Sequence, residues 1–478
     1  LDASPSWPAL HEVLRDRSRN ILFNHLGLRE DESGLTIRPD CADLPYFLRA
    51  YFSFKMGLPF GYSKCSRGGG GHPPRCYEWM SIQNPSEPRP SQPPMQKAAS
   101  RGLLDVLSEP QSRPAAEPAI RHLGLVPAFG HYLQALADGV HSGSARTSAN
   151  DENNDHYPVP LTQETLRPGT VYADPYGHVL MLVKRVPQTA DAAGVFLAVD
   201  GQPDATVARK RFWRGNFLFA HDPALGGPGF KRFRPIVLDK NGMLRRLTNE
   251  EIEKSQQYGD FSLEQSRLGV EEFYDRMDDV MSPEPLDPLR AMQEVITSLE
   301  EQVKARVTSV ENGRKFQNSG HSEAEMPEGP SIFETNGAWE DFATPSRDLR
   351  LLIAIDVVRT FPDRVARRPE RYAMPAGKSV QQVTAELEDV LARELASRTF
   401  SYTRSDGSQW TLALKDVVGR ASDLEMAYNL NDCVEFRWGA PEGSAEASTC
   451  RRRAPSVQRA KMSHYRIWFH ERRRPPRA

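Results

Sequence analysis

The chain has 478 residues, with 61 Lys and Arg against 63 Asp and Glu, so its formal net charge is −2. A near-neutral chain lacks the basic excess that is typical of nucleic-acid-binding proteins, which argues against that class. No segment approaches ~18 consecutive apolar residues, which excludes a membrane-spanning helix. At roughly 100–200 residues per domain the length predicts two to four domains, and 39% hydrophobic residues are enough to build their cores.

The N-terminal half begins with two predicted helices. Residues 7–30 carry spaced apolar side chains among many charges, and residues 41–56 are strongly apolar on one side. Eight prolines interrupt residues 81–118, which predicts an extended insertion over the surface, and the polar residues 141–157 predict a second loop. Runs of β-branched and aromatic residues then predict a small antiparallel sheet, with strands at 171–172, 178–183, 195–199 and 211–219.

From about residue 246 the pattern becomes helical. Apolar residues recur with helical spacing over 289–303 and 380–395, and a shorter apolar helix at 349–358 follows a polar loop at 313–346. The last stretch contains the candidate strands FSYTR, WTLAL and CVEFRW and ends in a basic segment. We therefore expect an α+β domain over residues 1–240 and a mainly helical accessory domain over 246–478, whose surface is a candidate binding site for a protein partner.

Five cysteines fall in a pattern that predicts two disulfides. Cys65 and Cys76 flank a run of four glycines, and Cys433 and Cys450 bracket another polar loop. Each pair would close a small ring, as in proteins of oxidising compartments, and Cys41 would remain a free thiol. The alternative is five reduced thiols. The first residue is Leu1, with neither an initiator Met nor a signal peptide, which fits a mature chain whose leader has been removed, or a trimmed chain.

Cys41 stands at the predicted start of the second helix. Asp40 is a good N-cap residue, so Cys41 would occupy the first helical position, and Pro45 is tolerated within the first turn. Such a position can lower a thiol pKa from ~8.5 to between ~3.5 and ~7.5, and its free N–H groups can form part of an oxyanion hole. The competing interpretation is a small buried side chain without chemistry.

His178 is the candidate base for that thiol. It begins the most apolar strand of the chain, VLMLV, where an imidazole can be held rigidly against a helix N-terminus. A third polar group is needed to fix the imidazole tautomer. Asp200, at the end of the next strand, is our candidate, with Gln202 as the alternative. His178 could instead be a packed or capping residue, and Asp200 could belong to a simple turn.

These segments resemble the NlpC-type papain-like cysteine peptidases and amidases that act on cell walls. Asp40-Cys41 at the head of an apolar helix is similar to the family's DCSG start, although Ala42 and Asp43 replace Ser-Gly. Leu166–Val171 followed by Gly177–Val183 is similar to its "LxPGDLV…HVGIY" strands. The resemblance covers roughly residues 35–220. It implies a papain-like fold with a small antiparallel sheet packed on the nucleophile helix, and Cys41, His178 and Asp200 as the catalytic triad.

The resemblance predicts a secreted or periplasmic cysteine hydrolase that cleaves amide bonds, with peptidoglycan stem peptides as the expected substrate. Two other functions remain open. One is a different papain-like activity, either proteolysis or transglutaminase-like acyl transfer. The other is a non-enzymatic wall-binding or scaffold protein. We expect neither a cofactor nor a catalytic metal, and no nucleic-acid partner.

Overall fold

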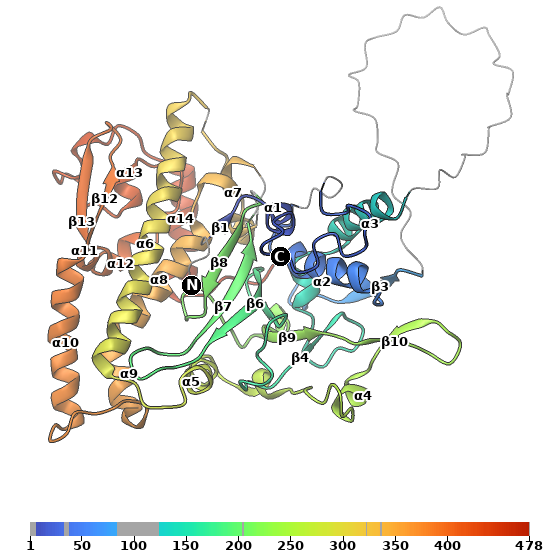
Figure 1. Cartoon of the computed structure of the whole chain (residues 1–478). Coiled ribbons are helices and arrows are strands. Elements are labelled where there is room, and N and C mark those ends of the chain that lie inside the picture. Colours follow the sequence, from blue (N-terminus) through green and yellow to red (C-terminus); the bar gives the residue numbers. More distant parts are fainter. Residues whose placement is uncertain are drawn as a thin grey trace, which may run out of the picture.

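The computed structural model describes residues 6–32, 38–83, 124–202, 205–321, 323–334 and 337–477. The proline-rich insertion predicted over 81–118 falls, from residue 84 on, outside the described residues. Within them the chain is a mixture of helices and antiparallel strands, which confirms the predicted α+β class. A sheet lies in the middle of the molecule, between the helices of the N-terminal half and those of the C-terminal half (Figure 1).

The central sheet has seven strands, more than the small sheet expected. Every neighbouring pair in it is antiparallel. In spatial order the strands are β1 (Ser6–Trp7), β8 (Val207–Arg211), β7 (Val195–Gly201), β6 (Val179–Val186), β5 (Val171–Ala173), β9 (Gly229–Phe233) and β4 (His156–Pro158). The described part of the chain also contains three two-stranded sheets: β2 (Gly61–Cys65) with β3 (Cys76–Ser81), β10 (Ile236–Leu238) with β11 (Leu244–Arg246), and β12 (Thr399–Thr403) with β13 (Gln409–Ala413).

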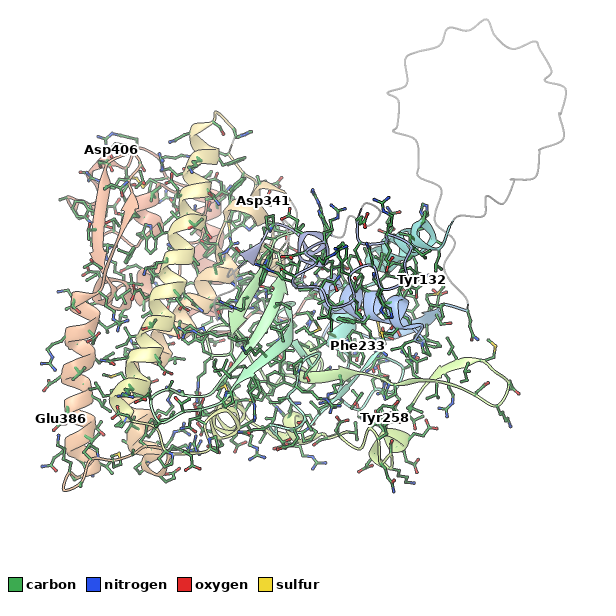
Figure 2. The ribbon with its side chains drawn as sticks, in the orientation of Figure 1. Tyr132, Phe233, Tyr258, Asp341, Glu386 and Asp406 are labelled. Carbon is green, nitrogen blue, oxygen red and sulfur yellow. A yellow bond between two sulfur atoms is a disulfide. The ribbon has the colours of Figure 1, made fainter. Side chains whose placement is uncertain are left out.

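Side chains alternate between the two faces of the central sheet, as the period of two of a β-strand requires. On β7, Phe196 and Ala198 join the core that includes Phe273 of α5 (Val270–Met281). Val199 points to the other face and packs against the core of α2 (Asp43–Met56) and α3 (Leu125–Gly139). Figure 2 labels Phe233 of β9, whose ring contacts Tyr46 of α2 edge-to-face. The sheet is therefore covered on both faces.

The C-terminal half is built around the long helix α6 (Pro288–Asn318). Its buried face carries apolar residues from Met292 to Val310, and Arg306 forms a buried ion pair with Asp348 at 2.7 Å. The other helices of this half are α7 (Ala338–Phe342), α8 (Pro345–Arg359), α9 (Phe361–Arg367), α10 (Val380–Ser397), α11 (Leu414–Gly419), α12 (Ala421–Leu424), α13 (Val434–Arg437) and α14 (Ser456–His470). The helices predicted at 289–303, 349–358 and 380–395 are all present.

Three predictions of local structure are wrong. The helix expected over 7–30 is only α1 (Leu10–Leu14), because the chain then turns repeatedly and adopts positive φ at Asn24 and Arg29. The strand expected over 211–219 overlaps β8 only at Arg211. Beyond it the chain forms a turn, in which the Asn216 and Phe217 N–H groups both donate to the Trp213 carbonyl. CVEFRW contains a short helix, α13, instead of a strand.

The loops were also shorter than predicted. Residues 141–157 contain the 3₁₀ helix Ser142–Ala145 and the start of β4, and residues 313–346 contain the end of α6 and all of α7. A short α4 (Asn249–Glu253) follows β11.

The hydrophobic cores separate later in the chain than the predicted domain boundary near 240–246. Ile252 and Met277 pack with the central sheet, whereas the C-terminal core begins at Met292. Residues 246–281 therefore cover the sheet of the N-terminal half, although their sequence has helical periodicity like that of the C-terminal half. The division into two domains itself stays a prediction.

Both predicted disulfides are present. Cys65 pairs with Cys76 across the β2–β3 hairpin, and Cys433 pairs with Cys450 in the C-terminal half. Cys41 is free and half-buried. The pairing inferred from spacing is thus confirmed, and the one cysteine left unpaired is the one at the head of α2.

Candidate active site

Cys41 lies in the turn that opens α2, and Asp40 caps this turn. The Asp40 carboxylate Oδ1 accepts hydrogen bonds from the backbone N–H groups of Ala42, at 2.8 Å, and Asp43, at 2.9 Å. The Leu44 N–H donates to the Asp40 carbonyl, so the helical pattern begins two residues before the assigned start of α2. Among the described residues the Cys41 N–H has no hydrogen-bond partner. The Cys41 N–H is therefore available to donate to an oxyanion.

His178 follows a tight turn between β5 and β6. The Asp174 N–H donates to the His178 carbonyl at 2.8 Å, and the Gly177 N–H donates to the Asp174 carbonyl at 3.2 Å. Gly177 has φ of 97°, a left-handed conformation that favours glycine. The Cys41 Sγ lies 3.9 Å from the Gly177 carbonyl oxygen. The turn therefore places His178 next to the residue that the Cys41 sulfur contacts.

Asp200 reaches His178 because the β6–β7 hairpin is antiparallel. Met181 pairs with Val199, so the start of β6 and the end of β7 lie at the same end of the sheet. The Asp200 Oδ1 is 2.8 Å from the His178 Nε2, and the Asp200 side chain is only 1% exposed. Gln202, the alternative third member, donates its amide to Asp200 Oδ2. Gln202 therefore contacts the Asp200 carboxylate, and Asp200 in turn contacts the His178 imidazole.

The imidazole stands between two groups that favour its charged form. Burial alone lowers the pKa of His178, but the charges of the neighbouring Asp200 and Cys41 outweigh it, so its pKa is raised to about 10. With Nε2 against Asp200, the opposite ring nitrogen is available to the sulfur. Three residues separated by up to 159 positions in the sequence therefore form one sulfur–imidazole–carboxylate array.

A glycine lets the Cys41 turn sit against β7. A Cβ at Gly201 would lie 2.4 Å from the Asp40 carbonyl oxygen and 3.0 Å from the Pro39 carbonyl oxygen. Both of these contacts are with backbone, which has little room to move. The Asp200-Gly201 pair is consequently more than a turn dipeptide, because Asp200 orients the imidazole and Gly201 admits the loop that carries the thiol.

Acidic groups gather on the outer side of the Cys41 turn. Burial and the neighbouring Asp40 charge raise the pKa of Asp43 to about 7. Burial, with the charges of Asp341 and Asp40, also raises the pKa of Glu340 on α7. Because the Asp40 charge acts on Glu340, α7 of the C-terminal half lies near this turn. Carboxyl groups from two segments of the chain thus lie near Cys41.

Sequence reasoning missed the groups that hold the His178 turn. Asp174 accepts from Arg350 of α8 at 2.7 Å and from the Tyr176 N–H at 2.7 Å. The Arg146 guanidinium donates to the Pro175 carbonyl at 3.0 Å, and that of Arg474 to the Tyr176 carbonyl at 2.8 Å. An aspartate four residues before a candidate His was a local signal. The three arginines come from distant segments, and nothing in the local sequence linked them to the turn.

A metal site does not emerge from the described residues. The one cluster of potential ligands among them consists of Cys433, Glu435 and Cys450. Its two sulfur atoms are bonded to each other, so they offer no thiolate to an ion. Cys41, His178 and Asp200 are a donor set suited to nucleophilic catalysis as they stand.

None of the helices in the described ranges is both long and apolar enough to cross a bilayer. Comparison of the chain with protein-family models, with curated proteins and with solved structures finds no match. The function must therefore be inferred from the chemistry of the site itself.

Proposed function

We propose that the chain is a cysteine hydrolase that cleaves amide bonds through Cys41, His178 and Asp200. The observation that carries the proposal is that one imidazole lies 2.8 Å from the buried Asp200 carboxylate and follows directly on Gly177, whose carbonyl oxygen is 3.9 Å from the only free thiol of the chain. A nucleophile, a base and a group that orients the base are what acyl transfer to sulfur requires. This order of contacts is also that of the NlpC-type papain-like family that the sequence resembles.

The first half-reaction forms a thioester. The Cys41 sulfur, with its proton on His178, attacks the carbonyl carbon of the substrate, and the carbonyl oxygen becomes an oxyanion. The free N–H of Cys41, at the positive end of the α2 dipole, is placed to stabilise that charge. His178 then donates its proton to the leaving nitrogen as the carbon–nitrogen bond breaks, and the amine product departs.

The second half-reaction restores the thiol. His178, now neutral, accepts a proton from water while the water oxygen attacks the thioester carbon. The carbon–sulfur bond breaks, the acid product leaves, and the proton taken from water returns to the sulfur–imidazole pair. Throughout, Asp200 keeps the ring oriented and favours the imidazolium, because its buried charge raises the pKa of His178 together with Cys41.

The proposed substrate is the stem peptide of peptidoglycan, and the proposed compartment is outside the cytoplasm. The substrate rests on the resemblance of Asp40-Cys41 and of the two strand segments to the NlpC family. The compartment is supported by the two disulfides, since such bonds form and persist in oxidising surroundings.

The test combines thiol labelling with product analysis. Because the other four cysteines are paired, iodoacetamide added without reductant reports on Cys41 alone. We expect rapid labelling near pH 7, slower labelling in His178→Ala, and no change in the control His464→Ala, whose side chain is exposed on α14. The wild type should release peptides from purified cell wall, and Cys41→Ala should not.

Other outcomes would overturn parts of the proposal. Labelling of Cys41 no faster than that of glutathione, in wild type and His178→Ala alike, contradicts the thiol hydrolase. Cleavage of an unfolded protein without release of wall peptides contradicts the substrate. Transfer of acyl groups to added amines in preference to water would indicate a transglutaminase-like enzyme. A Cys41→Ala variant with full biological effect would indicate a binding or scaffold protein.

A further inference from the structure

Four arginines surround a small cavity beside the turn that carries His178. The cavity has a volume of about 30 Å³, which is room for roughly two water molecules. It is lined by the glycine loop of the β2–β3 hairpin, by Arg67, Arg146 and Tyr176, and by the C-terminal segment 474–477. Tyr176 is two residues before His178, and the Cys41 sulfur contacts the carbonyl of the residue between them. The cavity and the thiol thus share one turn.

The positive charge around this cavity is poorly balanced. Of the described side chains that line it, Arg67, Arg146, Arg474 and Arg477 are cationic, and only Glu334, which pairs with Arg477, carries a carboxylate. Burial and the neighbouring arginines lower the pKa of Arg477, and burial with the charge of Arg67 lowers that of Arg146 despite Asp174. Asp174 does not line the cavity, and its carboxylate already accepts from Arg350.

Buried guanidinium nitrogens here lack acceptors. Arg146 is only 7% exposed, and its Nε has no hydrogen-bond partner among the described residues. The Nε atoms of Arg474 and Arg477 are likewise buried and without partners in that part of the chain. A buried donor without an acceptor costs roughly 1–3 kcal/mol, and more when it is charged, so an acceptor brought by a ligand would stabilise these arginines.

The glycine loop completes the wall of the cavity. Gly68, Gly70 and Gly71 have φ of 76°, 57° and 79°, and the Cys65–Cys76 disulfide closes the base of the loop. Gly69 and His72 exchange backbone hydrogen bonds at 3.0 Å, so the loop forms a tight turn beside the cavity. A β-carbon at Gly68 would meet the His72 carbonyl oxygen at 2.9 Å, so the loop needs glycine there for space as well.

We propose that this cavity binds one oxyanionic group, a carboxylate or a phosphate, carried by the molecule whose amide bond Cys41 attacks. The substrate assignment rests on the proposed function, whereas the anion site rests on the four arginines. The size of the cavity admits a single small oxyanion and excludes a sugar ring or a nucleobase. Because segment 474–477 forms one wall, the C-terminal half would take part in choosing the substrate.

The competing explanation is that the arginines serve only to hold the turn. Arg146 and Arg474 each donate one nitrogen to its backbone carbonyls, and Arg474 also stacks over the Tyr176 ring, 5.4 Å from its centroid. Those contacts do not use the Nε atoms, and they do not involve Arg67. A purely structural role therefore predicts that added anions bind no better than chloride.

The experiment measures anion binding to the full chain with Cys41→Ala, so that no turnover interferes. Inorganic phosphate and acetate are titrated by calorimetry at constant ionic strength, with sodium chloride as the reference. We expect saturable binding of at least one of the two, weakened roughly tenfold or more in Arg146→Gln and in the exposed Arg67→Gln. Arg290→Gln is the matched control, because Arg290 is exposed, pairs with Asp191 and does not line this cavity.

Each outcome decides something. Preference for acetate assigns a carboxylate substrate, and preference for phosphate assigns a phosphorylated one. Binding no stronger than that of chloride, or unchanged in both Arg146→Gln and Arg67→Gln, overturns the anion site. If Arg146→Gln does not fold, Arg67→Gln still decides, since its side chain is exposed. An active hydrolase that binds no anion contradicts this inference alone, and anion binding by a chain without hydrolase activity contradicts the proposed function alone.

Discussion

The two sides of the Cys41–His178 pair differ in charge and in origin. On the Cys41 side, the acids Asp40 and Asp43 come from the same turn as the thiol, joined by Glu340 of α7. On the His178 side, Arg146, Arg350 and Arg474 reach one turn from three distant segments. The thiol is thus placed by its own helix, whereas the imidazole is placed by the tertiary structure. Substitutions on the two sides should therefore fail in different ways.

The largest effect is expected on the His178 side, from Asp200→Asn. Loss of this buried charge should lower kcat/KM roughly 10²- to 10⁴-fold, because the imidazolium loses its stabilising partner and its fixed orientation. The pKa of His178, raised to about 10 by Asp200 and Cys41 against the effect of burial, should fall. A pH profile should then show the alkaline loss of activity at lower pH than in wild type. Gln202→Ala, which removes only a contact to Asp200, is the milder control.

The same raised pKa links the site to stability. The folded pKa of about 10 lies above the ordinary 6.5 of an imidazole, so the folded state holds the proton more tightly. This contribution is complete below about pH 6.5 and disappears as the pH rises through about 10. Asp200→Asn should therefore narrow the difference in Tm between pH 6 and pH 10, and an unchanged difference would contradict the charge pair.

Arg350→Gln tests whether the helical half positions His178. Its guanidinium donates to Asp174 at 2.7 Å and to the Asn216 carbonyl at 2.9 Å, across the junction between the halves. A small displacement of the turn should reduce kcat by roughly ten- to 100-fold with little change in KM. Slower iodoacetamide labelling of Cys41 should accompany it. Arg359→Gln, an exposed arginine at the end of α8, is the control on the same helix.

Gly201→Ala tests the contact between the two sides. The new Cβ would meet the backbone carbonyl oxygen of Asp40 at 2.4 Å, so the Cys41 turn must shift from β7. We expect a loss of about 1–3 kcal/mol in the free energy of unfolding, measured by urea titration. Gly419→Ala is the control, because its Cβ would meet nothing within 4 Å. Equal stability of the two variants would show that the turn does not rest on β7.

The smallest effect is expected on the acidic side, from Asp43→Asn. Burial and Asp40 raise the pKa of Asp43 from 3.8 to about 7, so its ionisation opposes folding. That penalty is absent below about pH 3.8 and complete above about pH 7. The Tm of Asp43→Asn should therefore rise relative to that of wild type as the pH increases from 4 to 8. A difference that does not vary with pH would place the Asp43 carboxyl in an ordinary, solvated environment.

Local patterns allowed a good part of the site to be predicted. Asp40 before an apolar run indicated a capped helix with Cys41 in its first turn, and His178 at the head of VLMLV indicated a rigid imidazole. Asp200 was chosen because it ends the next strand, but its position relative to His178 stayed open until the antiparallel pairing of β6 and β7 placed the start of one beside the end of the other. The errors came where local propensity was overruled. Residues 7–30 look helical, but Glu30 and Asp31 form a buried cluster with Lys55 that requires turns.

The sequence by itself determined which cysteine would be free, which helix would carry it, and which strand would begin with the histidine. Those properties depend on spacing, capping and periodicity, all of which act over a few residues. Only the tertiary structure decided that Asp200 faces Nε2, that Gly201 admits the Asp40 turn, and that arginines from residues 146, 350 and 474 converge on one loop. Such contacts depend on how distant segments pack, and a guanidinium can reach a carbonyl from any segment that packs beside it.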